Sequence, residues 1–430
     1  MSASTPAATG HESALRVGGA PEATHLRGAR AAVVLFSYYP MDPRPRRAAE
    51  TLARQGAKVD VICLRESAAE PRRETVNGVE VLRVPLRRRR GGALGYFAQY
   101  AAFLVSAMAI LAARSLTRRY HLVHVHNMPD ILVLSALVPK LTGAKVILDL
   151  HDPMPELMMT IFGVQAESLL VRLLKRLEKA SLGFADLALT VNTACQRLFV
   201  SRGCPIDKMH VVMNSPDEEI FRFQPARPES ATTRPGEPFV IMYHGSLVER
   251  NGLDLAVDAL ARVRATMPDA RLRIYGSATP FLERVLESVR ARGLATAVDY
   301  LGPRRLEDIA RAIQDCDVGI IPNQRNVFTE LNTPTRIFEY LALGKPVIAP
   351  RAAGVEGYFK DDSLMFFELG DAEDLARKIE YVFLHPGESI EIVKRGQKIY
   401  LAHAWSRERQ TLVNLVGALL PIGLGHTAGS

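Results

Sequence analysis

A polar loop followed by a short helical pattern holds the residues of this chain best suited to chemistry. The run Asn332–Tyr340 contains Asn, Thr, Pro, Arg and Glu and leads through a Gly-Lys-Pro turn to a buried strand at residues 347–349. A loop that opens a helix after a strand favours an anion, because unpaired amides and the helix dipole are positive there. Glu339 lies about two turns into the helix, too deep to cap it. A carboxylate at that place could accept two hydroxyls of a ribose.

A second polar loop, Tyr243–Gly252, follows a strand in the same half of the chain. Its glycines let backbone amides approach an anion closely, and the Arg250 guanidinium can clamp a diphosphate in bidentate fashion. Taken alone, an ordinary turn with a solvated arginine is the simpler interpretation. Together with the Glu339 loop, the segment favours an anion site.

Short apolar runs alternate with helical patterns along both halves of the chain, which predicts an α/β protein with two parallel sheets. The expected strands are 31–37, 58–64, 79–84, 122–126, 146–150, 187–191, 209–213, 240–244, 271–275, 298–301, 318–322 and 347–349. Ligands of such sheets gather at the carboxyl ends of the strands, and a cleft between two domains is a usual place for them. Neither half has a G-x-G-x-x-G turn, so dinucleotide-dependent redox chemistry is not expected.

The length of 430 residues is sufficient for two domains with separate cores. We predict a disordered leader at residues 1–28, a first domain at 29–214, a proline-rich linker at 215–237, a second domain at 238–403 and a further helix at 404–420. No secretory signal is visible, and the four cysteines are scattered without metal-ligand spacing. This pattern favours a reducing compartment.

Positive charge is concentrated in the first half. Residues 1–200 hold 26 Lys and Arg against 16 Asp and Glu, a net charge of +10, whereas the remaining residues hold 28 against 30, or −2. An excess of this kind suggests an anionic membrane or a phosphate-bearing lipid. Nucleic acid is not expected as a partner, because its motifs are absent and the basic residues adjoin apolar runs instead of aromatic platforms.

Residues 94–113 form an uncharged apolar helix pattern with arginines on both sides. Its length reaches the threshold for a membrane span, but positive charge at both ends leaves the orientation undefined, and a span would divide one sheet across the bilayer. A buried core helix and a helix lying on the membrane surface through residues 87–119 are the preferred interpretations.

Polar residues also end two adjacent strands of the first domain. His151 and Asp152 follow one strand beside stiffening prolines, and Asn127 and Asp130 follow the other. Each group also suits an ordinary role, a solvated loop histidine for the first and a strand-to-helix cap for the second.

The first polar loop of the chain, residues 41–47, carries three arginines. Arg44, Arg46 and Arg47 suit the pyrophosphate of a lipid acceptor if they face the cleft, or else they form a solvated charge run.

The two anion loops resemble those of the large family 4 of retaining glycosyltransferases, which have the GT-B fold. That family usually places Arg and Lys after the glycine of the phosphate loop, where this chain has Ser246 and Asn251. Its second signature is a pair of glutamates separated by seven positions. Glu339 matches the second, the ribose ligand, whereas Leu331 stands in place of the first, and Glu330 is one residue out of register.

The resemblance implies two Rossmann-like domains facing across a cleft, with the helix at 404–420 crossing back to the first domain. It also implies transfer of a hexose from a nucleoside diphosphate sugar with retention, without a metal ion or other cofactor. His151 would contact the donor sugar and the reacting centre, with Asp152 as its orienting partner and Arg250 on the departing diphosphate. The expected donor contacts are Gly245, Ser246, Asn251, Gly276, Asn332, Thr333, Pro334, Arg336 and Glu339, and the expected acceptor contacts are Arg44, Arg46, Asn127 and Asp130.

Three functions are therefore compared. The first is a hexosyltransferase at the cytoplasmic face of the membrane, peripherally bound, acting on a lipid-linked or glycan acceptor for exopolysaccharide, O-antigen or envelope glycan. The second is a catalytically silent nucleotide-sugar-binding scaffold, which the missing glutamate at Leu331 supports. The third is a sugar-nucleotide 2-epimerase of the same two-domain type.

Overall fold

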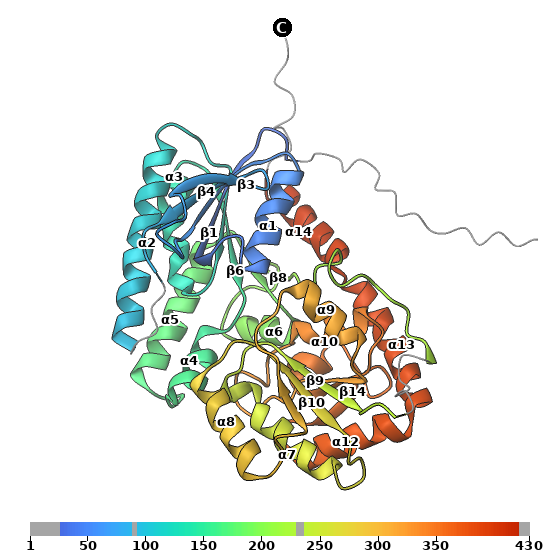
Figure 1. Cartoon of the computed structure of the whole chain (residues 1–430). Helices are drawn as coiled ribbons and strands as arrows, with labels where there is room; N and C mark the ends of the chain where they lie inside the picture. The colour runs from blue at the N-terminus through green and yellow to red at the C-terminus, as the bar shows by residue number, and fades with distance from the viewer. Residues whose placement is uncertain (1–25, 88–92, 229–235, 421–430) are drawn as a thin grey trace, which may run out of the picture.

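The computed structural model describes residues 26–87, 93–228 and 236–420, which form two α/β domains, one above the other in Figure 1. An eight-stranded sheet of order β3-β4-β2-β1-β5-β6-β7-β8 forms the first, and all its neighbouring strands are parallel except β3 and β4. The strands are β1 (Arg30–Tyr38), β2 (Lys58–Leu64), β3 (Arg73–Val76), β4 (Val79–Val84), β5 (Leu122–His126), β6 (Lys145–Leu150), β7 (Leu187–Thr190) and β8 (Met209–Val211).

Helices cover both faces of this sheet. One apolar cluster joins the sheet to α2, η1 and α5, and another joins the opposite face to α1 and α14. The helices of the first domain are α1 (Pro43–Arg54), α2 (Ala93–Ser115), η1 (Asp130–Ala136), α3 (Leu137–Leu141), α4 (Met154–Phe162), α5 (Leu169–Phe184) and α6 (Thr193–Ser201).

The second domain is built on a fully parallel sheet of order β11-β10-β9-β12-β13-β14. Its strands are β9 (Val240–His244), β10 (Arg271–Tyr275), β11 (Val298–Tyr300), β12 (Val318–Ile320), β13 (Val347–Arg351) and β14 (Met365–Glu368). Its helices are η3 (Glu249–Asn251), α7 (Leu253–Val263), α8 (Pro280–Ala291), α9 (Leu306–Gln314), α10 (Thr335–Ala342), α11 (Ala353–Glu356), α12 (Ala372–Leu384) and α13 (Pro386–Ala402).

The last helix, α14 (Trp405–Leu419), returns to the first domain, as the fold expected from the sequence requires. Leu412 and Val416 are buried in the same cluster as α1 and the first sheet. The expected fold of two Rossmann-like domains with a C-terminal crossover helix is thus confirmed.

The domain bounds differ from prediction at the amino terminus. Most of the leader predicted at 1–28 lies outside the described residues, but Leu26 is buried in the first domain, and its N–H donates to the Gln55 carbonyl (3.0 Å). Residues 229–235 of the predicted linker also lie outside the described part. Helix α1 begins at Pro43, inside the polar loop predicted at residues 41–47, because proline is well accommodated in the first turn of a helix.

Helix α2 packs on the sheet by one face only. Tyr100, Phe103, Ala107 and Leu111 are buried at helical spacing, whereas Val105 is 65% exposed on another face. The segment Phe97–Ser115 is long and apolar enough to cross a membrane by length and composition, and 22% of its most apolar 18-residue stretch is buried. The strands before and after it, β4 and β5, belong to one sheet.

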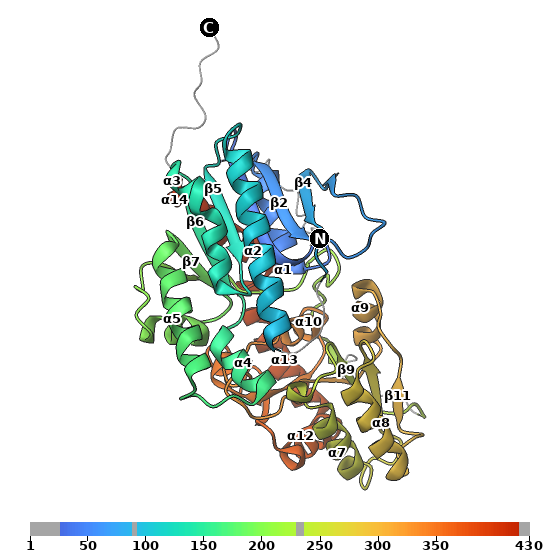
Figure 2. The same ribbon diagram turned by 90° about the vertical axis from the view of Figure 1, so that its left-hand side faces the viewer.

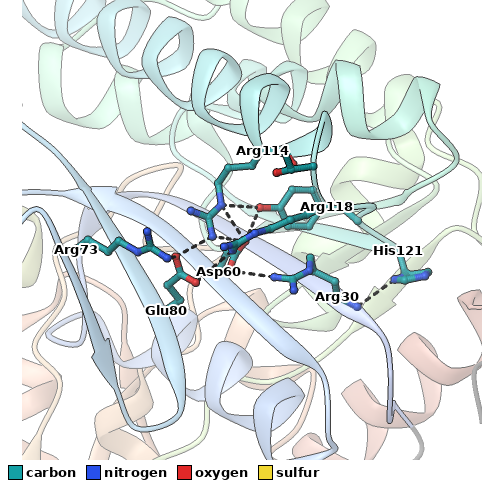
Figure 3. Close-up of polar contacts among 9 residues, drawn as sticks. Arg30, Asp60, Arg73, Glu80, Arg114, Arg118 and His121 are labelled. Atoms are coloured by element: carbon teal, nitrogen blue, oxygen red, sulfur yellow. Dashed lines mark hydrogen bonds and ion pairs between the residues drawn. The ribbon is translucent and has the colours of Figure 1, made fainter.

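The carboxyl end of α2 is tied to the sheet by a cluster of charges around Asp60 (Figure 3). Arg114 contacts both Asp60 (3.1 Å) and Glu80 (2.8 Å), and Arg118 contacts Glu80 (3.3 Å). Asp60 also lies 3.7 Å from Arg30, and only 2% of its side chain is exposed. Two of the arginines expected to flank a membrane-bound helix are therefore engaged within the domain.

Replacing Asp60 with Asn should destabilise the fold strongly. Arg30 and Arg114 would then lie beside a buried side chain that no longer carries a negative charge. We expect a loss of about 3 kcal/mol or more in the free energy of unfolding, measured by urea denaturation. The matched variant Glu80→Gln, at a side chain that is 23% exposed, should cost about 1 kcal/mol or less. Equal losses in the two variants would contradict this account of how α2 is anchored.

Candidate functional site

A small polar cavity opens at the carboxyl ends of β1, β5 and β6. Its volume is about 180 Å³, and its walls include Ser37, Asp42, Tyr100, His126 and His151. On one side of β1 the sheet continues with β2 and β4, and on the other side it continues with β5, β6, β7 and β8. The cavity thus lies where the strand order reverses, which is where open α/β sheets bind ligands.

His151 lies in the wall of this cavity and is held by its neighbours. Its Nε2 lies 2.9 Å from His126 Nδ1, and its backbone N–H donates to Asn127 Oδ1 (2.8 Å). Burial lowers the pKa of both imidazoles, that of His126 most strongly, with the nearby histidines adding to the effect. His151 is therefore neutral at pH 7 and meets a ligand as a hydrogen-bonding group without charge.

Beneath these histidines lies a buried ion pair. Arg44 Nη2 is 2.7 Å from Asp149 Oδ1, its Nε is 3.1 Å from both carboxylate oxygens, and its Nη1 donates to the Val212 carbonyl (2.8 Å). Burial is the largest single effect on Asp149 and opposes its ionisation, but the Arg44 charge and the neighbouring imidazoles together outweigh it and hold the pKa of Asp149 well below its usual range. Arg44 is thus an internal, ion-paired residue, and its expected role in acceptor binding stays a prediction.

The same carboxylate also faces two imidazoles. Asp149 Oδ2 lies 3.4 Å from His124 Nε2 and 3.3 Å from His126 Nδ1, so the three groups have the geometry of a possible metal site. The Arg44 guanidinium already contacts both carboxylate oxygens and supplies the compensating positive charge. The cluster therefore fits an ion-paired floor beneath His151 better than a cation site.

Asn127 and Asp130 have structural partners. Asn127 Nδ2 donates to Asp130 Oδ1 (2.9 Å) and to the Asp152 carbonyl (2.8 Å), so Asn127 joins the ends of β5 and β6. Asn127 reaches the wall of the His151 cavity, whereas Asp130 is buried and lines a different cavity beside it. Burial raises the pKa of Asp130 to about 6. Of the two expected acceptor contacts, Asp130 does not border the His151 cavity.

Asp152 of the first domain and Arg250 of the second influence each other's ionisation. Burial raises the pKa of the Asp152 carboxyl to about 6, although the Arg250 charge pulls in the opposite direction. Burial likewise lowers the pKa of Arg250, and Asp152 counters that effect. The Arg250 guanidinium carbon also lies 5.7 Å from the centre of the Phe328 ring. His151 and Asp152 thus line one cavity, and Arg250 acts on the Asp152 charge from the second domain. The catalytic roles of the three residues stay predictions.

In the second domain, Glu339 does not point into the apolar interior. Its side chain is 12% exposed, and its Oε2 lies 2.6 Å from His244 Nε2. The other ring nitrogen of His244 lies 3.0 Å from the Tyr340 hydroxyl, which donates to the Met242 carbonyl (3.0 Å). His244 was not among the expected site residues. Its place at the end of a strand, directly before Gly245, was the signal that sequence reasoning overlooked.

Arg336 lies on the same helix as Glu339, one turn before it. Its Nη1 donates to the His244 carbonyl (2.6 Å), and its guanidinium carbon lies 4.9 Å from the centre of the Tyr243 ring. Arg336 is half-buried here and contacts a backbone carbonyl and an aromatic ring. Arg336 reaches to within 3.2 Å of the place where a Cβ on Gly245 would lie. The α10 residues and the β9 loop therefore form one continuous surface.

Glycines make the phosphate loop compact. Gly276 places its backbone so near Gly245 that a Cβ on Gly276 would meet the Gly245 carbonyl oxygen at 2.3 Å. Gly245 and Ser246 are exposed, and the Ser246 carbonyl accepts from Asn251 Nδ2 (2.8 Å) and the Tyr243 hydroxyl (2.8 Å). Asn251 thus braces the loop, leaving Arg250 as the cation of this segment.

The loop before α10 contacts both domains. Thr333 Oγ1 donates to the Gly354 carbonyl (2.6 Å), Pro334 is buried at the helix start, and Asn332 is half-buried. The Leu331 carbonyl accepts from Asn192 Nδ2 of the first domain (2.9 Å). This loop therefore fixes one domain against the other at the position where the family pattern places its first glutamate.

The remaining arginines of the first loop lie near the domain connection. Arg46 contacts Asp217 (3.4 Å) and borders a separate cavity of about 500 Å³. Arg47 donates to Ser215 and Asn214 and lies over the Trp405 ring, with its guanidinium carbon 4.7 Å from the ring centre. Arg46 does not line the His151 cavity, and the acceptor role expected for it stays a prediction.

Comparison with known proteins agrees with this geometry. Residues 41–215 match the model of a "Glycosyl transferase 4-like domain", and residues 238–384 match "Glycosyl transferases group 1". Among curated relatives, a putative colanic acid biosynthesis glycosyltransferase WcaL of Escherichia coli is 26% identical over 50% of this chain and 52% of its own. The sulfoquinovosyl transferase SQD2 of Arabidopsis thaliana is 22% identical over 63% of this chain and 51% of its own. The chain spans about half the length of these relatives.

Solved structures share the fold over nearly the whole chain. A sucrose-phosphate synthase from Thermosynechococcus elongatus superposes with a TM-score of 0.73 at 18% identity, covering 91% of this chain and 99% of that one. Anabaena HepE in complex with UDP superposes with a TM-score of 0.66 at 17% identity, covering 91% and 100%. With both domain models matched in order, the chain belongs to the family 4 glycosyltransferases of the GT-B fold.

Proposed function

We propose that this glycosyltransferase moves a hexose from a nucleoside diphosphate sugar to a lipid-linked or glycan acceptor, with retention at the anomeric carbon. The observation that carries the proposal is the Glu339–His244 pair in the second domain, where Glu339 Oε2 lies 2.6 Å from His244 Nε2. Arg250 of the same domain acts on the charge of Asp152, which lines the His151 cavity. A carboxylate oriented by an imidazole is suited to the hydroxyls of a ribose. Solved structures of Anabaena HepE contain UDP and UDP-glucose, which supports a nucleotide-sugar donor.

The reaction we propose depends on positive side chains and not on a metal ion. The bond between the anomeric carbon and the diphosphate oxygen breaks, and a bond to the acceptor oxygen forms on the same face. The acceptor proton passes to the departing phosphate. Charge grows on the diphosphate during this step, so Arg250, Arg336 and the amides of the Gly245 loop stabilise it most in the transition state. Neutral His151 positions the sugar by hydrogen bonding.

The acceptor is proposed to lie at the inner face of the cell membrane. Relatives named for colanic acid and lipopolysaccharide core biosynthesis support a role in envelope or extracellular glycan synthesis. Helices α2, α4 and α5 lie together on the side that faces the viewer in Figure 2. On α5, Leu169 and Leu173 are 79% and 51% exposed, and Arg172, Arg176 and Lys179 are exposed beside them. Apolar and basic side chains together suit an anionic membrane surface.

Donor turnover tests the function directly. With a panel of nucleotide sugars, we expect one donor to raise the melting temperature and to be hydrolysed slowly to the nucleoside diphosphate. Glu339→Ala should abolish the thermal shift, and Arg250→Ala should lower turnover by about 10²-fold, as the loss of an oxyanion-type donor does. Arg262→Ala, at an exposed arginine of α7, is the matched control and should change neither. Binding without turnover in the wild type would instead favour the silent scaffold that Leu331 suggests.

The pH dependence follows from Asp152. The pKa of Asp152 is raised from 3.8 to about 6, so between these values the folded protein binds a proton that the unfolded chain does not. Its ionisation above pH 6 therefore costs stability while it supplies a charge opposite Arg250. We expect donor hydrolysis to fall as the pH drops through about 6, and Asp152→Asn to flatten this limb, lower the rate and raise the melting temperature at pH 7. If the fall in donor hydrolysis below about pH 6 is unchanged in Asp152→Asn, that fall is assigned to His151.

Membrane binding is tested with vesicles containing phosphatidylglycerol. Exchanging Arg172, Arg176 and Lys179 for Glu should weaken sedimentation with the vesicles by on the order of 10²-fold, since each basic residue near an anionic surface contributes about 1 kcal/mol. High salt should release the wild-type protein. Exchanging Arg284 and Arg290 of α8 and Arg292 directly after it for Glu alters the charge in the same direction on the second domain and should have little effect. Equal effects of the two triple variants would contradict docking through α5.

A further inference from the structure

A second cavity adjoins the His151 cavity and differs from it in chemistry. Its volume is about 310 Å³, and it lies among α2, η1, α4 and α5. Phe97, Leu104, Ile131, Met154 and Leu174 are among the side chains that line it, and Asp130 is the charged residue at its border. A water-filled apolar cavity of this size is unfavourable, so an apolar ligand gains by entering it.

The two cavities share a wall. Tyr100 lines both, and the hydrogen bond between Asn127 and Asp130 (2.9 Å) joins a residue of the polar cavity to one of the apolar cavity. Met154, in the apolar wall, begins α4 only three positions after His151. A molecule with a polar head beside His151 would thus find apolar surface on the other side of Tyr100.

The apolar cavity also reaches the outside of the domain. Phe97 is 39% exposed, and Ala101 is exposed on the same helix. Beyond them lies the exposed face of α2, which has no charged residue between Phe97 and Ala113. A hydrocarbon chain can therefore enter from an apolar surface without passing a charge on α2.

We propose that this cavity binds the hydrocarbon chain of the acceptor, so that the acceptor is an amphiphile whose polar end reaches the His151 cavity. A water-sized group occupies roughly 30 Å³ in a liquid, so the cavity of about 310 Å³ has room for on the order of ten methylene-sized units. The inference rests on the proposed function, because it names the acceptor class for the same site. It selects a lipid acceptor over a free glycan.

The test uses dodecanoate, below its micelle concentration, as a hydrocarbon probe in isothermal titration calorimetry with the full chain. We expect saturable binding of one molecule per chain, with the negative heat-capacity change that apolar burial produces. Ala101→Trp places an indole at the mouth of the cavity from an exposed position and should weaken binding by about tenfold or more, since it removes apolar contact area. Ala109→Trp adds the same side chain to an exposed position of α2 that does not line the cavity and should bind dodecanoate as the wild type does.

The outcomes separate this inference from the proposed function. Equal affinities of Ala101→Trp and Ala109→Trp, or no saturable binding at all, would overturn the cavity assignment. Donor hydrolysis is measured in the wild type and in Ala109→Trp and should be the same in both, because Ala109 lines neither cavity. Donor hydrolysis without dodecanoate binding would support the proposed transferase activity and reject the lipid cavity. Dodecanoate binding without donor hydrolysis in the wild type would reject the transferase activity and leave the cavity assignment standing.

Discussion

The buried ion pair between Arg44 and Asp149 is the interaction on which the first half of the site depends. Asp149 is the next-to-last residue of β6, just before the His151 loop. Arg44 reaches it from the first turn of α1 and also donates to the carbonyl of Val212 beyond β8. A charge at this depth is tolerated only with a partner of good geometry, and loss of either group would leave the other uncompensated. The pair therefore fixes three separate segments against one another. The floor beneath His126 and His151 is rigid because these segments cannot shift independently.

The second half of the site reaches this floor through a set of hydrogen bonds between the domains. Thr160 contacts Asn326 (3.2 Å), Thr193 N–H donates to the Tyr358 hydroxyl (2.9 Å), and Thr335 donates to the Asn214 carbonyl (2.9 Å). Leu331 adds an apolar contact, because its side chain packs against the core of the first domain. A glutamate at this position would bury a carboxylate in that contact. Leu331 in place of the first family glutamate thus has a physical consequence. The apolar side chain favours contact between the two domains, where the usual glutamate would bind sugar.

The sequence predicts the sheets well and the side-chain partners poorly. Strands such as Lys58–Leu64 and Val240–His244 have the predicted bounds, because buried parallel strands are continuous apolar runs. The hydrophilic edge strand β3 was missed, although the Asn77–Gly78 turn after it, with positive φ at both residues, is a typical hairpin signal. The loops that carry Glu339 and Arg250 are recognisable because their residues are close in sequence. The burial of Arg44 cannot be recognised from the sequence, because its partner Asp149 lies 105 positions away. An arginine suits a solvated loop equally well.

The anchoring of α2 links the two cavities to the chemistry. Arg114 and Arg118 hold the carboxyl end of the helix to Asp60 and Glu80, so the helix cannot slide along the sheet without separating buried charges. Its other half carries Tyr100, which lies between the polar and the apolar cavity. A hydrocarbon bound along this half is therefore held at a fixed distance from His151. Such positioning lowers the entropic cost of bringing an acceptor hydroxyl to the reacting carbon, because the chain has already lost its freedom on binding. Charges remote from the site thereby contribute to the orientation of a substrate that they never touch.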